Sequence, residues 1–169
     1  MTNPSDIEKT TMIRILLALI CPDSGMAYWE DVIGNLHRLR PSSRRLFAYA
    51  SRGNTLMSGT IRENIISGHQ DATDTKIGQA ARDAEIEAFI EELDKKYESQ
   101  IGDNGLYLSD SHFQRIAIAR ALVARAPVLI LDEATSALDA ETEGRILSNV
   151  MKRQPKLICI LATHRAAAT

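Results

Sequence analysis

Two adjacent carboxylates, Asp132 and Glu133, follow directly on an unbroken apolar run at residues 128–131 (VLIL). Such a short continuous run is typical of a strand that is buried on both faces of a parallel sheet. Open α/β sheets bind their ligands at the carboxyl ends of the strands, which is where this pair falls. One carboxylate can hold Mg²⁺ while the next polarises a water molecule, as in phosphoryl transfer. By itself the pattern also fits a structural role, in which Asp132 caps a loop and Glu133 is solvated.

A second segment that could do chemistry lies at residues 3–11 (NPSDIEKTT). The P-loop pattern G-x-x-x-x-G-K-[ST] cradles phosphate groups, and Lys9 and Thr10 occupy its last two positions. Asn3 and Glu8 stand where that pattern has glycines. Glycine is needed there because backbone N–H groups must turn inward and approach the phosphate closely. Taken alone, the Lys-Thr-Thr sequence is a weak signal and favours a purely structural interpretation.

The apolar pattern predicts the elements that must position these residues. Buried strands are expected at residues 46–50 (LFAYA), at residues 128–131 and at residues 157–162 (LICILA). A helix over residues 140–153, capped by Asp139, would connect the last two strands. Strand, helix and strand over this distance predict a right-handed βαβ unit with parallel strands.

Helical spacing predicts further elements outside this unit. Apolar residues recur at helical intervals in residues 10–20 and in parts of residues 60–93. They do so again in residues 113–124, where Asp110 and Ser111 are suited to cap the helix. An amphipathic core helix is a sufficient explanation for this last segment, with or without chemistry at its start.

Several longer segments carry a resemblance to a known family. Residues 127–139 (PVLILDEATSALD) resemble, almost letter for letter, the Walker B motif and D-loop of ATP-binding-cassette (ABC) transporter ATPase domains. Residues 108–122 (LSDSHFQRIAIARAL) resemble the signature helix of that family, usually written LSGGQRQRIAIARAL. Residues 57–65 (MSGTIRENI) and 101–105 (IGDNG) resemble two exporter segments, FSGTIRENI and the X-loop VGERG. The chain is therefore identified as a member of this family and is similar to its exporters.

The resemblance implies a site for ATP and Mg²⁺. Lys9 and Thr10 would bind the nucleotide, and Thr10 together with Asp132 would hold Mg²⁺. Glu133 would orient the attacking water as a general base. His164 would contact the γ-phosphate, although a lone histidine considered without the resemblance is usually not catalytic. Further nucleotide-binding residues that the same motifs imply are Ser5, Thr11 and Ser109.

Three motifs depart from the family pattern. The P-loop GPSGSGKTT has lost its glycines, the Q-loop glutamine has become arginine, and the Gly-Gly-Gln of the signature is replaced. The substituted residues are Asn3, Asp6, Glu8, Arg52, Asp110, Ser111 and His112. Two like charges about 4 Å apart repel by about 4 kcal/mol at an effective dielectric of about 20, so carboxylates beside a triphosphate would weaken its binding. Arginine can bind phosphate, but it can neither accept a hydrogen bond nor ligate a cation.

By this resemblance the fold class is α/β, a P-loop NTPase-like and mostly parallel sheet flanked by helices, with an inserted helical subdomain. We expect one domain over residues 1–169, with a RecA-like core of residues 1–52 and 115–169 and a helical subdomain of residues 53–114. Only two residues precede the P-loop. We therefore expect a domain truncated at both ends, without the N-terminal β-rich segment and without the P-loop strand that should lie beside the Walker B strand.

The composition is that of an ordinary globular protein, with 169 residues of which 44% are hydrophobic and 25% charged, enough for one sizeable core. The net charge of −2 predicts no broad attraction to nucleic acid or anionic lipid. Cys21 and Cys159 lie in apolar runs and are expected to be buried thiols in a reducing compartment. No apolar run approaches the roughly 18–20 residues of a membrane helix, and no signal peptide is recognisable.

Three functions remain open at this stage. The first is an ATPase at the inner face of the cell membrane, paired with a second nucleotide-binding domain and driving export through a transmembrane domain, with no nucleic-acid partner. The second is a non-hydrolysing ABC-like pseudo-ATPase, structural partner or gene fragment, which the substituted motifs favour. The third is a regulatory module in which Arg52 and the arginine-rich residues 36–45 bind another anion, although a solvated surface explains those arginines more simply. The transported substrate does not follow from the sequence.

Overall fold

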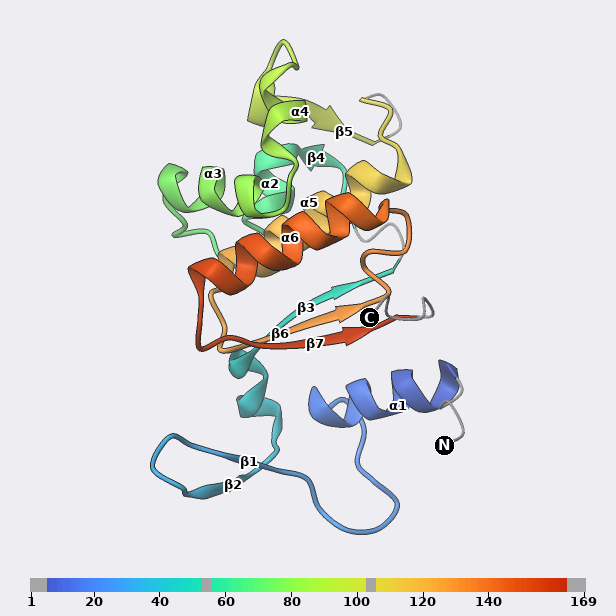
Figure 1. Ribbon diagram of the computed structural model, residues 1–169, viewed down its shortest axis with the longest axis vertical. Helices are drawn as coiled ribbons and strands as arrows, with labels where there is room; N and C mark the ends of the chain where they lie inside the picture. Colours follow the sequence, from blue (N-terminus) through green and yellow to red (C-terminus); the bar gives the residue numbers. More distant parts are fainter. Residues whose placement is uncertain (1–5, 53–55, 103–105, 164–169) are drawn as a thin grey trace. The chain divides into compact units, whose positions relative to one another are not determined.

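The structure, a computed structural model, describes residues 6–52, 56–102 and 106–163 (Figure 1). It divides into two compact units, Met1–Phe47 and Ala48–Thr169. The second unit contains the carboxylate pair, the signature helix and almost all of the parallel sheet. The first unit contains the P-loop segment.

A three-stranded sheet forms the base of the second unit. Its strands are β3 (Phe47–Ser51), β6 (Val128–Asp132) and β7 (Ile158–Ala162), in the order β3-β6-β7. Strands β6 and β7 are parallel and pair residue by residue, from Val128 with Ile158 to Asp132 with Ala162. Figure 1 shows all three arrows pointing the same way. The expected α/β class with a parallel sheet is confirmed.

The position of β6 in this sheet corrects one expectation. We expected the place beside the Walker B strand to belong to a P-loop strand that the chain lacks, but the two neighbours of β6 in the described sheet are β3 and β7. The reason is that the βαβ connection through α6 (Ala140–Arg153) places β7 directly next to β6. The end of β6 is therefore flanked by β3 on one side and by β7 on the other.

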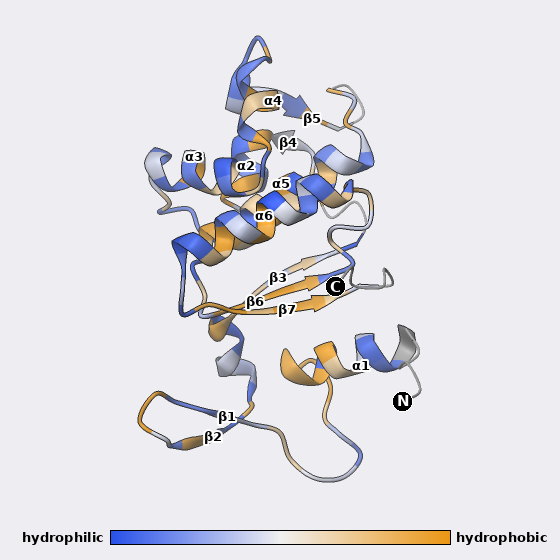
Figure 2. Ribbon diagram, in the orientation of Figure 1, coloured by the Kyte–Doolittle hydropathy of each residue, from blue (hydrophilic) through white to orange (hydrophobic). Residues whose placement is uncertain are grey.

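Helices α5 (Asp110–Val123) and α6 cover one face of this sheet (Figure 1). The middle of β6 is fully buried, with Leu129, Ile130 and Leu131 no more than 1% exposed. Figure 2 shows strongly hydrophobic residues along β6 and β7. The expected burial of residues 157–162 holds only in part, because β7 is an edge strand on which Ile158 is 59% and Leu161 is 37% exposed. Helix α6 begins at the predicted cap, where the Asp139 carboxylate accepts the N–H of Thr142 at 2.8 Å.

Short helices and a two-stranded ribbon build the rest of the second unit. The ribbon pairs β4 (Gly59–Thr60) with β5 (Gln100–Ile101), and α2 (Ile61–Ile65), α3 (Asp74–Asp83), α4 (Glu87–Glu91) and η2 (Lys96–Glu98) lie between its strands in the sequence. Helices α2 and α3 pack against α5. The packing is carried by isoleucines that are at most 1% exposed, namely Ile61, Ile65, Ile77, Ile86 and Ile90.

The first unit consists of α1 (Asp6–Leu16), the antiparallel hairpin β1 (Tyr28–Glu30) and β2 (Leu36–Arg38), and the 3-10 helix η1 (Pro41–Leu46). The predicted helix over residues 10–20 begins and ends four residues earlier. It ends because Ala18 adopts a left-handed φ of 49°, as residues just beyond helix ends often do. Cys21 lies beyond this end and is exposed, so its predicted burial was wrong.

One of the arginines in residues 36–45 caps this helix. Arg44 donates hydrogen bonds to the carbonyl oxygens of Leu17 at 2.8 Å and Ala18 at 2.7 Å. Those carbonyls have no intrahelical partner, and a cation at a helix C-terminus is favourable. Arg44 therefore has a structural role and is not free to form an anion site.

None of the helices in the described ranges combines the length and the apolar character that crossing a bilayer requires.

The exporter-like segment at residues 57–65 contains a buried amide side chain, that of Asn64, which bonds the backbone of the same segment. Asn64 is 1% exposed, and its side chain bonds the N–H and C=O of Met57, at 2.8 and 2.9 Å, and the C=O of Thr60 at 3.0 Å. Thr60 also caps α2, in a capping box with Glu63. This small polar centre holds β4 against the start of α2.

We predict that Asn64→Ala lowers the free energy of unfolding by about 3 kcal/mol, because it removes three hydrogen bonds, one of them to the buried carbonyl of Thr60. Urea unfolding followed by circular dichroism measures the change. The control is Gln70→Ala, at an exposed position of the same unit. Equal unfolding midpoints for the two variants would contradict the role given to Asn64.

Candidate functional site

The carboxylate pair lies at the carboxyl end of β6, as the sequence predicted. Tyr49, on the neighbouring strand β3, donates its hydroxyl to Oδ2 of Asp132 at 3.0 Å. The backbone N–H of Arg52 donates to the carbonyl oxygen of Asp132 at 2.7 Å, which continues the pairing of the two strands. Asp132 is thus held on one side by contacts from β3 and the residue that follows it, and on the other side it pairs with Ala162 of β7.

Glu133 is held from both sides of β6. Its N–H donates to the carbonyl oxygen of Ala162 on β7 at 2.8 Å, and its φ of 52° turns the chain away from the strand direction. Its Oε2 accepts a hydrogen bond from Nη1 of Arg52 at 3.0 Å, which makes an ion pair. The side chain of Glu133 is 15% exposed and that of Arg52 is 68% exposed. The residue in the Q-loop glutamine position therefore contacts the residue in the general-base position directly.

The D-loop is tied to the signature helix by a glutamine that the sequence analysis did not single out. Gln114 of α5 is 5% exposed, donates to the Ser136 hydroxyl at 2.8 Å and accepts the N–H of Ala137 at 2.9 Å. A polar residue on the apolar stripe of α5 was the available signal, because a buried amide requires partners.

The start of α5 differs from what we expected. We considered Asp110 and Ser111 as caps, but Ser109 is the N-cap and its hydroxyl accepts the N–H of His112 at 3.3 Å. In return, Nδ1 of His112 accepts the N–H of Ser109 at 3.4 Å, which completes a capping box. Ser109 is the N-cap because it directly precedes the first helical residue, Asp110, which is the position that a cap occupies.

His112 is packed against the helical part of the unit. Its ring stacks on Phe89, with ring centroids 3.8 Å apart and an interplanar angle of 19°. Burial lowers the pKa of His112 from its ordinary value, and the charge of Arg115 lowers it further. The hydroxyl of Ser109 and the ring of His112 are thus engaged in capping and packing. Asp110 is exposed in the first turn of α5.

The P-loop residues that the structure describes lie within a helix. Helix α1 begins at Asp6, so Lys9, Thr10 and Thr11 are all helical. A helix that begins there already uses the N–H groups of Thr10 and Thr11 as intrahelical donors. Glu8 is exposed on this helix. Asn3 and Ser5, the side chain of Asp6, His164 and residues 103–105 of the X-loop lie outside what the structure describes.

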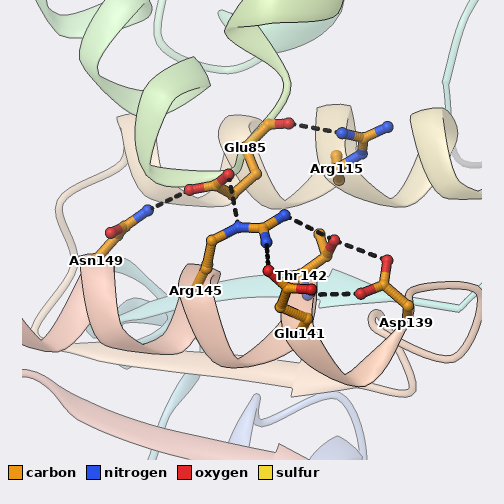
Figure 3. A network of polar contacts seen from close by, with 7 residues as sticks. All are labelled: Glu85, Arg115, Asp139, Glu141, Thr142, Arg145 and Asn149. Carbon is orange, nitrogen blue, oxygen red and sulfur yellow. Dashed lines mark hydrogen bonds and ion pairs between the residues drawn. The ribbon is translucent and has the colours of Figure 1, made fainter.

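A polar network joins the turn between α3 and α4 to the two long helices (Figure 3). The Glu85 carboxylate accepts from Nε of Arg145 at 3.1 Å and from Nδ2 of Asn149 at 2.8 Å, both on α6. The Glu85 carbonyl accepts from Nη1 of Arg115 on α5 at 2.6 Å. Glu85 has a φ of 56°, a conformation that aims its carbonyl and its side chain at different helices.

The same network reaches the end of the D-loop. Arg145 donates to the hydroxyl of Thr142 at 3.0 Å, and that hydroxyl donates to Asp139 at 2.7 Å. Hydrogen bonds from Thr142 hold the pKa of Asp139 below its ordinary value, and the hydrogen bond to Glu85 raises that of Arg145. The sequence analysis missed this link, because residues at such separations come together only through packing.

The residues present fit a divalent ion only in part. Asp132 supplies a carboxylate, which is the type of oxygen ligand that Mg²⁺ prefers. Arg52 supplies a guanidinium where the resemblance implied an oxygen ligand, and a guanidinium can only donate. Across residues 6–52, 56–102 and 106–163, no three His, Cys, Asp or Glu side chains gather closely enough to hold a metal ion. Mg²⁺ shared by Thr10 and Asp132 stays a prediction.

Comparison with known proteins agrees with this geometry. A family described as ABC transporter matches residues 7–136. The chain therefore belongs to the ABC transporter family, and it corresponds to the ATP-binding domain of exporter-type members. The predicted family and fold class are confirmed.

Several of the similar proteins have names that describe an ATP-binding and a permease part together. The chain is 37% identical over 163 residues to a probable multidrug resistance ABC transporter ATP-binding/permease protein, YheI, of Bacillus subtilis. This match covers 95% of this chain and 27% of that protein. It is 41% identical over 145 residues to an ATP-dependent lipid A-core flippase of Chromohalobacter salexigens, covering 86% and 25%. It is 39% identical over 165 residues to the beta-(1→2)glucan export ATP-binding/permease protein NdvA of Agrobacterium fabrum, covering 96% and 27%. The chain thus spans about a quarter of the length of these relatives.

A solved structure agrees in three dimensions. The structure of a bacterial Atm1-family ABC exporter with ATP bound matches with a TM-score of 0.84 and 34% identity. The match covers 96% of this chain and 28% of that one.

We predict that Gln114→Leu lowers the free energy of unfolding by about 2 kcal/mol, since it removes two hydrogen bonds, those to the Ser136 hydroxyl and from the N–H of Ala137. Amide hydrogen exchange at Ala137 should accelerate more than exchange in β6. Gln70→Leu serves as the matched control at an exposed site. Unchanged exchange at Ala137 would show that the D-loop does not depend on this side chain.

We predict a pH dependence of stability that comes from His112. Its folded-state pKa is lowered, so the unfolded chain binds the proton more tightly. The free energy of unfolding of the wild type, relative to that of His112→Gln, is then highest above about pH 6.5. It decreases as the pH drops from there through the lowered pKa of His112. Urea midpoints of both proteins between pH 8 and pH 5 measure it. A difference that does not vary with pH would refute the assignment.

Proposed function

We propose that this chain is an ATP-binding domain that powers an ABC-type exporter, and that it binds Mg²⁺-ATP more weakly than an intact domain does. Export is supported by the similarity to proteins whose names describe multidrug resistance, lipid flipping and glucan export. These names differ in substrate, so the proposal includes no particular substrate.

The observation that carries weak binding is the acidic start of α1. Glu8 directly precedes Lys9 on an exposed face of the helix, and Asp6 is the first helical residue. Each carboxylate within about 4 Å of a phosphate oxygen would oppose binding by about 4 kcal/mol at an effective dielectric of about 20. A micromolar ligand has only about 8 kcal/mol of binding free energy, so two such charges offset most of it. Helical hydrogen bonding from Asp6 onward further reduces the N–H groups available to phosphate.

The proposal includes the partners that such a domain requires. A transmembrane domain would carry the substrate, and a second nucleotide-binding domain, identical or different, would complete each ATP site with its Ser109 region. The chain would then work at the cytoplasmic face of the membrane. The division into a core of residues 1–52 and 115–169 and a helical subdomain of residues 53–114 is part of the same proposal.

A second candidate function is a non-hydrolysing domain that keeps the family fold as a structural or regulatory partner. The contact between Arg52 and Glu133 favours it, because it engages the residue that would orient the attacking water. In this case Asp132 would retain its place at the end of β6 without turnover.

We predict that Asp6→Gly/Glu8→Gly tightens the dissociation constant for Mg²⁺-ATP at least tenfold, which is about 1.4 kcal/mol, by removing two negative charges and restoring glycine to the loop. Isothermal titration of the full chain measures the constant. Asp23→Gly/Asp71→Gly is the control, since it removes the same charge at exposed loop positions. Micromolar binding by the wild type, equal to that of the reverted variant, would reject the proposal.

A further inference from the structure

The ion pair between Arg52 and Glu133 lies where the family pattern would place a glutamine and a general base. We propose that Arg52 is an internal cation that holds the Glu133 carboxylate and keeps it from acting on a divalent ion or a water molecule. This rests on the proposed ATP-binding function, and it adds a second restraint that is independent of the P-loop.

The backbone fixes Arg52 at this place. Its N–H donates to the carbonyl oxygen of Asp132 at 2.7 Å, so the residue that follows β3 is registered against the last residue of β6. From there Nη1 reaches Oε2 of Glu133 at 3.0 Å. Because the backbone of Arg52 is bonded to Asp132, its side chain starts next to Glu133 and reaches it without any change in the backbone.

Glu133 is equally constrained. Its N–H is bound to Ala162 of β7, and its left-handed φ of 52° directs the residue away from the strand. Its side chain is only 15% exposed, whereas that of Arg52 is 68% exposed. The guanidinium is therefore largely open to solvent, while the carboxylate that it holds is largely covered.

The chemistry of the two side chains makes the contact inhibitory. A general base must accept a proton from water through a free oxygen lone pair, and a divalent ion needs oxygen ligands and low positive charge nearby. Arginine is always charged at neutral pH and can only donate hydrogen bonds. It thus engages one oxygen of Glu133 and repels a second cation. Tyr49 bonds Asp132 through a neutral hydroxyl, so that carboxylate keeps its charge uncompensated by this contact.

The exposure of Arg52 makes the proposal testable without unfolding the protein. Ion pairs with one solvent-exposed partner contribute little to stability, so Arg52 can be replaced at small cost to the fold. Glutamine is the informative replacement, because it removes the cation and restores the oxygen ligand that the family pattern has.

The first experiment measures Mn²⁺ binding to the full chain without nucleotide, by the loss of the free-ion electron paramagnetic resonance signal. We expect Arg52→Gln to bind Mn²⁺ at least tenfold more tightly than the wild type. Arg52→Lys should resemble the wild type, because it keeps the charge. Arg45→Gln, an exposed arginine of the first unit, is the matched control and should also be unchanged. In Arg52→Gln/Glu133→Gln the gain should disappear.

The second experiment uses the Asp6→Gly/Glu8→Gly background, in which ATP binding is restored. Adding Arg52→Gln should raise kcat at least tenfold and leave KM within about twofold, because the restraint acts on the water-activating step. Failure of the P-loop reversion to tighten ATP binding would concern the proposed function alone, since Mn²⁺ binding needs no nucleotide.

The proposal is overturned if Arg52→Gln binds Mn²⁺ no better than the wild type, or if the gain survives removal of Glu133. It is equally overturned if Arg52→Lys shows the same gain as Arg52→Gln, because the positive charge would then be irrelevant.

Discussion

The parallel pairing of β6 with β3 and β7 is the constraint on which the candidate site depends. Because the middle of β6 is buried and both of its edges are flanked by strands, the two residues at its end are held in register with their neighbours. Asp132 is bonded by β3 and the residue after it and pairs with Ala162 of β7, and the backbone contact of Glu133 also comes from β7. A carboxylate pair on a mobile loop could not be held in this way.

Two of the substituted residues, His112 and Arg52, are bound by other residues of the same chain. His112 accepts a hydrogen bond from the backbone of Ser109 and stacks on Phe89, and Arg52 pairs with Glu133. Such contacts stabilise the domain locally and at the same time occupy groups that a nucleotide or a metal ion would need. The family fold is therefore compatible with both a weakened ATPase and a domain that has kept only its architecture.

The helical part of the second unit is joined to the sheet through the two long helices. Buried isoleucines supply the apolar contact, and Glu85 supplies the polar one by bonding residues of both α5 and α6 (Figure 3). Because Arg145 and Thr142 extend these contacts to Asp139, the cap of α6 and the α3–α4 turn belong to one hydrogen-bonded system.

The sequence by itself determined the family, the strands that form the parallel sheet, the cap at Asp139 and the location of the carboxylate pair, because these follow from local patterns of apolar residues and from contiguous motifs. Tertiary structure alone decided that β3 and β7 flank β6, that Arg52 bonds Glu133, that Gln114 holds the D-loop, and that Glu85 meets Arg145. The reason is that these contacts join residues that are far apart in the chain. Their geometry depends on strand order and helix packing, which no single segment of the sequence determines.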